Sequence, residues 1–214
     1  MKHPGLLNDI LFKIVFGSQS SEPVLRALLN ALLGLSGPDT IVELEILNPG
    51  FDKEYLVEKG PILDVKARDQ AGRQYNIEVQ LSPGFGDYIA RSVFYATKYF
   101  VDQLERGESY NTLRKTVSLT IADFDLFPES DALHSTFRLW DPNRGVALTD
   151  LLELHYIDLR KFSRSSPQEL SSGFERWLYL LKFGDIFNEG QPVPTNLAQE
   201  EGITMAINSM RKAY

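Results

Sequence analysis

The segment at residues 62–80, ILDVKARDQAGRQYNIEVQ, contains two runs in which apolar and polar residues alternate. Alternation with a period of two is typical of strands that bury one face, and the RDQAGR between the runs is a polar, glycine-containing turn sequence. Leu63 and Val65 in the first run, and Ile77 and Val79 in the second, then point into the core. The sequence therefore predicts a hairpin with one apolar face and one polar face.

The polar face of this hairpin brings two acids together. Pairing that is symmetric about Ala71 places Asp64 opposite Glu78 and Lys66 opposite Asn76. Two like charges directly opposite each other cost up to about 1 kcal/mol in an exposed pair, so folding alone does not favour this arrangement. Two explanations fit: a solvated face on which Lys66 bridges the acids, or a site for a divalent cation, which prefers oxygen ligands. A bulge would shift the register.

The segments around the hairpin predict further helices and strands. Apolar spacing and capping residues predict helices at residues 8–17, 21–34 and 87–107, and strands at residues 40–48 and 115–124. Asn8 or Asp9 is the expected N-cap of the first helix, and Pro23 and Gly34 mark the start and end of the second. The order through residue 124 is helix, helix, strand, strand, strand, helix, strand.

Two of these helices carry apolar stripes. In the first helix the apolar residues at helical spacing are Ile10, Leu11, Ile14 and Val15. In the helix at residues 87–107 the apolar stripe comprises Ile89, Val93, Ala96, Phe100 and Leu104. A polar and aromatic stripe on another side of the same helix comprises Arg91, Tyr95, Lys98 and Asp102.

The pattern is weaker elsewhere. Residues 49–60 are expected to form a loop, and the segments STFRLWD (135–141) and ELHYIDL (153–159) are expected to form strands. A helix is expected from about residue 167, although Gly173 weakens its middle. A linker at residues 188–196 then leads to a short terminal helix.

Composition narrows the class of protein. With 43% hydrophobic and 24% charged residues, 214 residues are enough for one sizeable globular core. No apolar run approaches the roughly 20 residues that span a bilayer, and the N-terminus does not resemble a signal peptide, so we expect a cytoplasmic protein with no membrane partner. The chain has no cysteine, which excludes disulfides, zinc–thiolate sites and thiol catalysis.

Charge and histidine content bear on partners and metals. The net charge of −7 argues against a nucleic-acid partner, because phosphate binding depends on Lys and Arg, but metal ions and a local basic strip can compensate for it. The three histidines, His3, His134 and His155, are far apart in the sequence and form no H-x-x-x-H pattern. They do not predict a histidine-rich zinc site.

The spacing D-x13-E-x-Q, read from PILD (61–64) and EVQ (78–80), resembles the motif of PD-(D/E)XK nucleases. Six segments in unbroken order, from residue 8 to about residue 124, resemble the recombination-promoting nuclease (Rpn) family, also described as PD-(D/E)XK nuclease family transposases. These segments are NDILFKIVFG, LLNALLGL, IVELEILNP, ILDVKARDQAGRQYNIEVQ, FYATKYFVDQLERGESY and TVSLTIADF. The resemblance implies an α/β (α+β) fold with a restriction-endonuclease-like core, in which helices flank a mixed sheet. Residues 1–124 would form this core, and residues 125–214 a C-terminal extension of strands and helices that packs on it.

The resemblance also implies an activity. It indicates a bacterial DNA endonuclease, linked to recombination or mobile elements, that uses Mg²⁺ or Mn²⁺ to hydrolyse phosphodiester bonds. By this analogy Asp64 and Glu78 hold the metal, and Gln80 stands at the position of the motif's final lysine. Many relatives also carry glutamine there. Lys66, on the same predicted face, is a candidate to supply the missing charge.

Four further residues are candidates on the same grounds. Asp9, in the family's ND-x-x-F-K helix, is a candidate metal contact, with a plain N-cap as the alternative, and Lys13 one turn later is a candidate phosphate contact. Arg91 and Tyr95 are candidates to line the DNA-binding face, and a solvated helix side is their alternative.

Two other functions fit the same sequence. The chain could be a catalytically decayed nuclease fold that binds DNA or protein, which Gln80 and the acidic net charge favour. Alternatively, the C-terminal region could form a homodimer or contact a partner through an apolar patch, although core packing is the simpler role for most of its aromatic residues, Trp140, Trp177, Tyr179 and Phe183.

Overall fold

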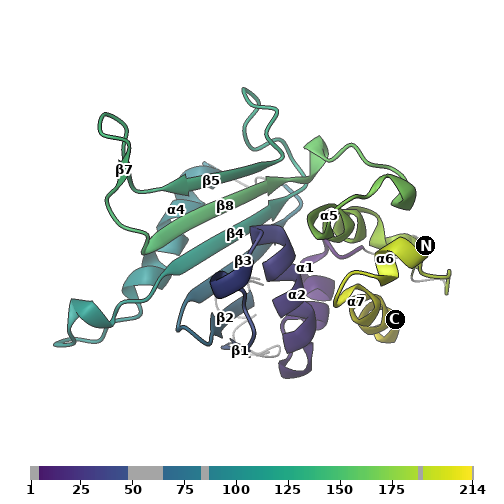
Figure 1. Ribbon diagram of the computed structural model, residues 1–214, viewed down its shortest axis with the longest axis horizontal. Coiled ribbons are helices and arrows are strands. Elements are labelled where there is room, and N and C mark those ends of the chain that lie inside the picture. The colour runs from purple at the N-terminus through teal and green to yellow at the C-terminus, as the bar shows by residue number, and fades with distance from the viewer. Residues whose placement is uncertain (1–4, 48–64, 83–86, 188–189, 214) are drawn as a thin grey trace.

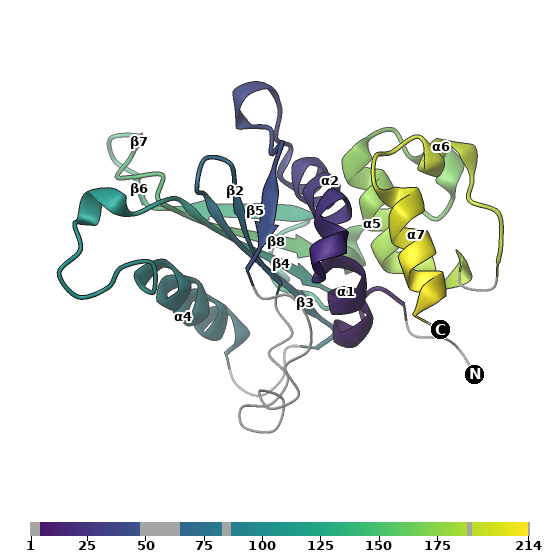
Figure 2. The same ribbon diagram turned by 90° about the horizontal axis from the view of Figure 1, so that it is seen from below.

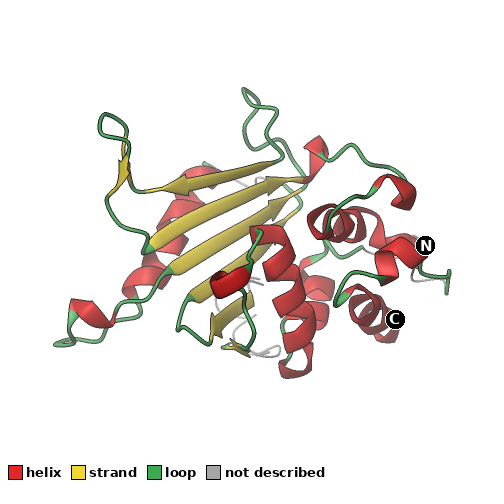
Figure 3. Cartoon of the chain, viewed as in Figure 1, coloured by secondary structure: helices red, strands yellow, loops and turns green. Residues whose placement is uncertain are grey.

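The computed structural model describes residues 5–47, 65–82, 87–187 and 190–213. At its centre is a six-stranded mixed sheet in the order β1-β2-β3-β4-β8-β5 (Figure 1, Figure 3). In that order the strands are Leu44–Ile46, Val65–Asp69, Gln74–Gln80, Thr116–Ala122, Leu152–Asp158 and His134–Arg138. β3, β4 and β8 run parallel, and the outer pairs are antiparallel. Helices flank this sheet, which confirms the predicted α+β architecture and the predicted order of elements through residue 124.

The hairpin of β2 and β3 has the predicted register. Lys66 lies opposite Asn76, as expected for pairing that is symmetric about Ala71. The apolar residues of both strands are buried on one face, and the polar residues lie on the other. Asp64, which was expected opposite Glu78, lies outside the described residues.

The turn between these strands explains the register. The buried carboxylate of Asp69 accepts hydrogen bonds from the backbone N–H groups of Ala71 and Arg73, both at 2.9 Å. The Tyr75 hydroxyl donates to the same carboxylate at 3.0 Å. Gly72 takes a φ of +79°, a conformation that L side chains rarely adopt. The turn residues therefore fix which residues of the two strands face each other.

α1 (Asp9–Phe16) begins after Asn8, whose side-chain oxygen accepts a hydrogen bond from the N–H of Leu11 at 3.2 Å. Asn8 rather than Asp9 is therefore the N-cap. The predicted apolar stripe is only half right, because Ile10 and Ile14 are exposed. The buried side of α1 follows the i, i+1, i+4, i+5 spacing with two phenylalanines in place of these isoleucines, and consists of Leu11, Phe12, Val15 and Phe16.

α2 (Glu22–Leu33) has the predicted limits, with Pro23 in its first turn and Gly34 after it at a φ of +64°. Together with α1, it covers one face of the sheet, and α5 (Gly173–Phe183) and α7 (Ile203–Lys212) pack against these two helices beyond the end of the sheet (Figure 1). The main hydrophobic core lies between these helices and the apolar face of β2, β3 and β4. Among the C-terminal aromatics, Trp177 and Tyr179 are buried in this core, as expected, and Trp140 is 54% exposed.

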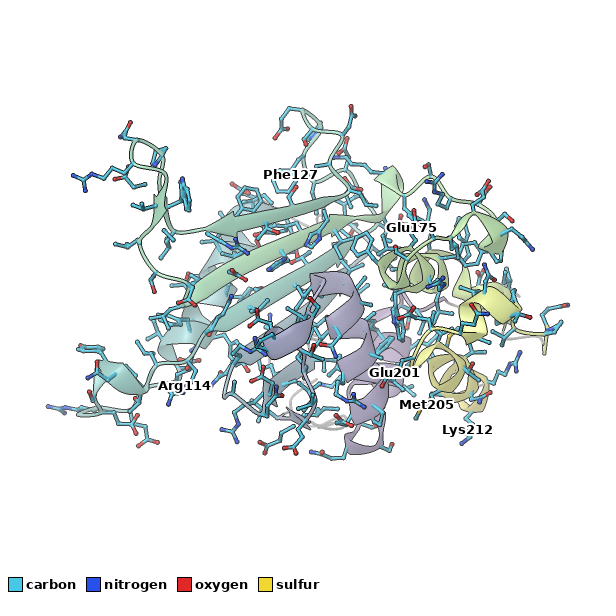
Figure 4. The ribbon with its side chains drawn as sticks, viewed as in Figure 1. Arg114, Phe127, Glu175, Glu201, Met205 and Lys212 are labelled. Atoms are coloured by element: carbon cyan, nitrogen blue, oxygen red, sulfur yellow. The ribbon has the colours of Figure 1, made fainter. Side chains whose placement is uncertain are left out.

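α4 (Tyr88–Val101) lies on the opposite face of the sheet (Figure 2). A second, smaller apolar cluster lies beneath its N-terminal end and consists of Tyr88, Ala122, Phe124 and Tyr156. Phe127 borders this cluster near the β5 edge (Figure 4), with its ring centroid 5.6 Å from that of Tyr156.

The predicted apolar stripe of α4 is wrong in part. Ala96 is buried as expected, but Val93 is 43% exposed, and the other buried residues of the helix are Tyr88 and Ser92. The Ser92 hydroxyl lies 2.7 Å from the Tyr156 hydroxyl. α4 packs mainly on β4 and β8, on the sheet face that also carries the polar residues of the hairpin, so hydrogen bonding as well as hydrophobicity decides which of its sides is buried.

Two predicted elements are longer than the observed ones. β1 starts at Leu44, because the side chains of Asn30 and Gln70 bond the backbone of residues 40–43 in place of a strand partner. α4 ends at Val101, because the side chain of Gln103 bonds the backbone of Arg114 and redirects the chain towards β4.

The C-terminal region continues the same sheet. β8 and β5 confirm the two predicted strands, and a short antiparallel arm between them, β6 (Trp140–Asp141) with β7 (Val146–Ala147), projects from the sheet (Figure 1). The helix predicted from residue 167 begins only at Gly173, because the Ser172 hydroxyl caps it by accepting from the N–H of Glu175 at 3.2 Å. A 3-10 turn at Pro167–Glu169 precedes it. The predicted terminal helix is divided into α6 (Thr195–Ala198) and α7.

None of the helices in the described ranges is long and apolar enough to cross a bilayer.

Candidate active site

The candidate site lies in a polar layer between α4 and the sheet. β3 contributes Asn76, Glu78 and Gln80 from its polar face, because alternate residues of a strand share a face. β4 lies parallel to β3 and places Thr120 beside Glu78. Tyr88, the first residue of α4, reaches this layer from the helix side. Residues that are far apart in the sequence thus surround one carboxylate.

Glu78 is held through both of its carboxylate oxygens. The Gln80 amide donates to Oε1 of Glu78 at 2.5 Å, and the Tyr88 hydroxyl lies 3.3 Å from Oε2. The same hydroxyl lies 3.4 Å from Oγ1 of Thr120. The carboxylate is half-buried, so these donors restrict its orientation while part of it stays accessible.

Electrostatics fix Tyr88 as a donor. Burial, followed by the negative charge of Glu78, raises the pKa of Tyr88 far above its usual value. Burial and Glu78 also raise the pKa of Tyr156, although the hydrogen bond with Ser92 opposes this shift. Both hydroxyls therefore remain protonated across the physiological range, and Tyr88 can donate to Glu78 throughout.

Lys66 and Asn76 lie next to each other in the hairpin register, on the α4 side of the sheet. The Lys66 ammonium lies 4.8 Å from the ring centroid of Tyr99, which belongs to α4, so its stem crosses the polar layer. The buried Oδ1 of Asn76 has no hydrogen-bond partner within the described ranges. An unsatisfied buried oxygen is costly, which makes this atom an available acceptor for a bound group.

The substrate-binding candidates of α4 lie along one side of that helix. Arg91 is half-buried, and its guanidinium carbon lies 5.0 Å from the ring centroid of Tyr88. Tyr95 follows one turn later and is 41% exposed. Arg91 therefore contacts the tyrosine that bonds Glu78, whereas Tyr95 lies one turn farther along the helix.

The remaining candidates are placed less completely. Asp9 is the first residue of α1, and its side chain lies outside what the structure describes. Lys13 lies in the last turn of α1. A Cβ added at Gly17, the residue after this helix, would lie 3.4 Å from the Val65 side chain, so the end of α1 approaches the start of β2. Asp64 directly precedes Val65 in the sequence.

The donor set suits a hard cation only in part. Glu78 and the free Oδ1 of Asn76 supply oxygen atoms on one face, as Mg²⁺ or Mn²⁺ requires. Within the described ranges, no group of three or more His, Asp or Glu side chains could hold a metal ion. Glu78 and Asn76 could therefore supply part of the ligand set of such an ion. A second carboxylate would be needed to complete the set.

Sequence reasoning missed Tyr88 and Thr120. The segment KTVSLTIADF (115–124) contains β4, which is buried along its whole length, and its polar residues Thr116, Ser118 and Thr120 alternate with apolar ones. This period of two indicated a second polar strand face beside that of β3. Tyr88 follows the N-cap Asp87, and nothing in its local pattern distinguishes it from a core aromatic.

No curated protein and no solved structure matches the chain significantly. A family model described as PD-(D/E)XK nuclease family transposase matches residues 6–213, which include β8, β5 and the C-terminal helices as well as the candidate site. The chain therefore belongs to the PD-(D/E)XK nuclease family transposases.

Proposed function

We propose that this protein is a divalent-metal-dependent DNA endonuclease that hydrolyses phosphodiester bonds, with Asp64 and Glu78 as its metal ligands. Family membership supports the nuclease activity. The observation that carries the assignment is the clamping of Glu78 by Gln80 and Tyr88 on a polar strand face. A solvated surface glutamate needs no such support.

The register supports Asp64 as the second ligand. Val65 pairs with Ile77, and in the sequence Asp64 directly precedes Val65 while Glu78 directly follows Ile77. We propose that the pairing continues by this one step, which brings the second carboxylate to Glu78. A Mg²⁺ or Mn²⁺ ion held there would lower the pKa of a bound water and neutralise charge on the phosphoryl oxygens.

The chain's own residues then have distinct roles. Gln80 occupies the position of the motif's lysine. Its proposed role is to orient the metal ligand Glu78 through a hydrogen bond rather than to supply a positive charge. Lys66 of β2 lies on the same face of the sheet as Glu78 and Gln80 of β3. It is the proposed source of positive charge for the nucleophilic water or the phosphate. Arg91 and Tyr95 on α4, and Lys13 on α1, are proposed to bind DNA phosphates. Asp9 is the candidate for a further metal contact.

A plasmid-cleavage assay tests this proposal. Purified protein should nick or linearise DNA with Mg²⁺ or Mn²⁺ and not with EDTA, and Asp64→Asn and Glu78→Gln should each abolish cleavage. Glu45→Gln is the matched control, because Glu45 is an exposed glutamate of β1 that pairs with Arg68. Full cleavage by the folded Asp64→Asn or Glu78→Gln protein would contradict the assignment.

Glutamine in place of the motif's lysine at position 80, together with the net charge of −7, favours one alternative, a nuclease fold that binds DNA without cleaving it. Calorimetric titration with Mn²⁺ separates the two functions. A nuclease should bind Mn²⁺ and lose this binding with Glu78→Gln, whereas a decayed site should bind no Mn²⁺ in either protein.

A further inference from the structure

Two of the three histidines meet near the β5 edge of the sheet, where the His134 ring stacks on Phe174 of α5 with ring centroids 5.8 Å apart. His155 of β8 lies directly opposite Thr136 of β5, and His134 precedes Thr136 by two residues. All three side chains therefore share the sheet face that is opposite α4. His155 is buried and Thr136 is exposed, so solvent reaches this cluster from one side.

The donor atoms of these side chains converge. Nε2 of His134 lies 3.0 Å from Nδ1 of His155, and Oγ1 of Thr136 lies 3.3 Å from the same Nδ1. Two cis nitrogens on one ion are separated by about 2.9 Å in tetragonal geometry and about 3.4 Å in tetrahedral geometry, for metal–nitrogen distances near 2.0–2.1 Å. The two imidazoles are joined by a hydrogen bond in this structure, and its N···N distance lies within the range that two ligands of one cation would have.

The carboxylate of Glu153 lies next to the other ring nitrogen of His155. The second ring nitrogen of His155, Nε2, lies 3.4 Å from Oε2 of Glu153, which favours the proton on Nε2 and the lone pair on Nδ1. Glu153 is itself fixed by Lys115 at 3.0 Å and by Arg138 at 2.6 Å. A carboxylate that fixes the tautomer of a histidine is the usual second partner of a metal-binding imidazole.

We propose that His134 and His155, with Thr136 and solvent completing the coordination, bind a late first-row divalent cation such as Zn²⁺ or Cu²⁺. Lys115 and Arg138 more than balance the charge of Glu153, so imidazole nitrogen rather than local negative charge provides the affinity. Neutral imidazole suits these ions, whereas Mg²⁺ prefers oxygen ligands. With the lone pair on Nδ1 of His155, the proton of the hydrogen bond between the rings is on Nε2 of His134. Binding of the ion would displace this proton and leave His134 as its Nδ1–H tautomer, and the ion would link β5 at the sheet edge to β8.

The site is independent of the proposed nuclease site, and the test separates the two. Zn²⁺ affinity is measured by competition with a chromogenic chelator, in a Glu78→Gln background that weakens the nuclease site. One Zn²⁺ should bind per chain, and His134→Gln and His155→Gln should each weaken binding at least tenfold. His3→Gln, which removes the one remaining histidine, should leave it unchanged.

Cu²⁺ provides a spectroscopic test of the ligands. The electron paramagnetic resonance spectrum of the Cu²⁺ protein should show superhyperfine coupling to two imidazole nitrogens, and His134→Gln should reduce the coupling to one. His134 is only half-buried, so this variant is expected to fold even if His155→Gln does not. Unchanged Zn²⁺ affinity or unchanged coupling in folded His134→Gln would overturn the proposal.

Discussion

At the scale of single residues, Tyr88 has the most specific role in the candidate site. Its hydroxyl donates to Oε2 of Glu78, the carboxylate oxygen that Gln80 does not contact, and burial keeps that hydroxyl protonated. Tyr88→Phe keeps the ring and removes only this donor. A hydrogen bond to a charged group contributes about 1.5 kcal/mol, so the rate of metal-dependent DNA cleavage should fall about tenfold.

This effect should appear in the single-turnover rate with little change in thermal stability, because the buried ring remains. Tyr110→Phe is the matched control, since Tyr110 is 80% exposed and far from Glu78 in the sequence. An equal loss of rate in both variants, or none in Tyr88→Phe, would show that Tyr88 does not position the carboxylate.

Glu153 is the residue whose ionisation should affect stability most visibly. Burial opposes its ionisation, but hydrogen bonds from His155 and Lys115, with the charges of Lys115 and Arg138, prevail and lower its pKa to about 2. A lowered pKa means that the charged form stabilises the fold above pH 4.5, the usual value, and that this contribution is lost as the pH falls towards 2. Glu153→Gln should therefore lower the free energy of unfolding by about 2 kcal/mol at pH 7.

Denaturant unfolding at pH 7 and at pH 3 checks this. The difference between wild type and Glu153→Gln should shrink at the lower pH, because the wild-type contribution is then partly lost. A difference that does not depend on pH would show that Glu153 acts through packing alone.

At the scale of elements, the β2–β3 hairpin is the part that sequence reasoning predicts best. Its period of two and its turn both depend on local residues, so the pairing of Lys66 with Asn76 could be derived directly. The buried side of α4 could not be derived in this way. It depends on what the helix meets, and the contacts of Ser92 and Tyr88 with distant Tyr156 and Glu78 outweigh its hydrophobic pattern.

The turn residue Asp69 should therefore carry much of the stability of the hairpin. Asp69→Ala leaves the buried Tyr75 hydroxyl and the Arg73 guanidinium without this acceptor and should cost about 3 kcal/mol in the free energy of unfolding. Urea denaturation provides the measurement. Asp102→Ala, which breaks only an exposed pair with Lys98, should cost less than about 1 kcal/mol. Similar losses in both variants would contradict a special role for the turn.

At the scale of the whole molecule, contacts between distant strands limit what the sequence can reveal. The pairing of β5 with β8 brings His134 and His155 together, although the β6–β7 arm separates the two strands in the sequence. No local sequence pattern specifies this pairing. Thr120 becomes a neighbour of Glu78 only because β3 and β4 run parallel with a particular offset. Local spacing was enough to make Glu78 and Gln80 candidates, but it could not indicate partners that depend on strand order.

The division at residue 124 leads to the last prediction. β4 is buried along its whole length, with β3 on one side and β8 on the other, and β8 lies beyond residue 124. The main core also includes Trp177 and other buried side chains of α5 and α7. A fragment of residues 1–124 would expose the β8-facing edge of a buried strand and lose one wall of the core, so we expect it not to fold cooperatively alone.

Circular dichroism during urea denaturation should show a sigmoidal transition for the full chain and none for the fragment, and adding residues 125–214 as a separate polypeptide should restore the transition. A cooperative transition for the fragment alone would instead establish residues 1–124 as an autonomous unit, with the C-terminal strands as an addition to a sheet that is already stable.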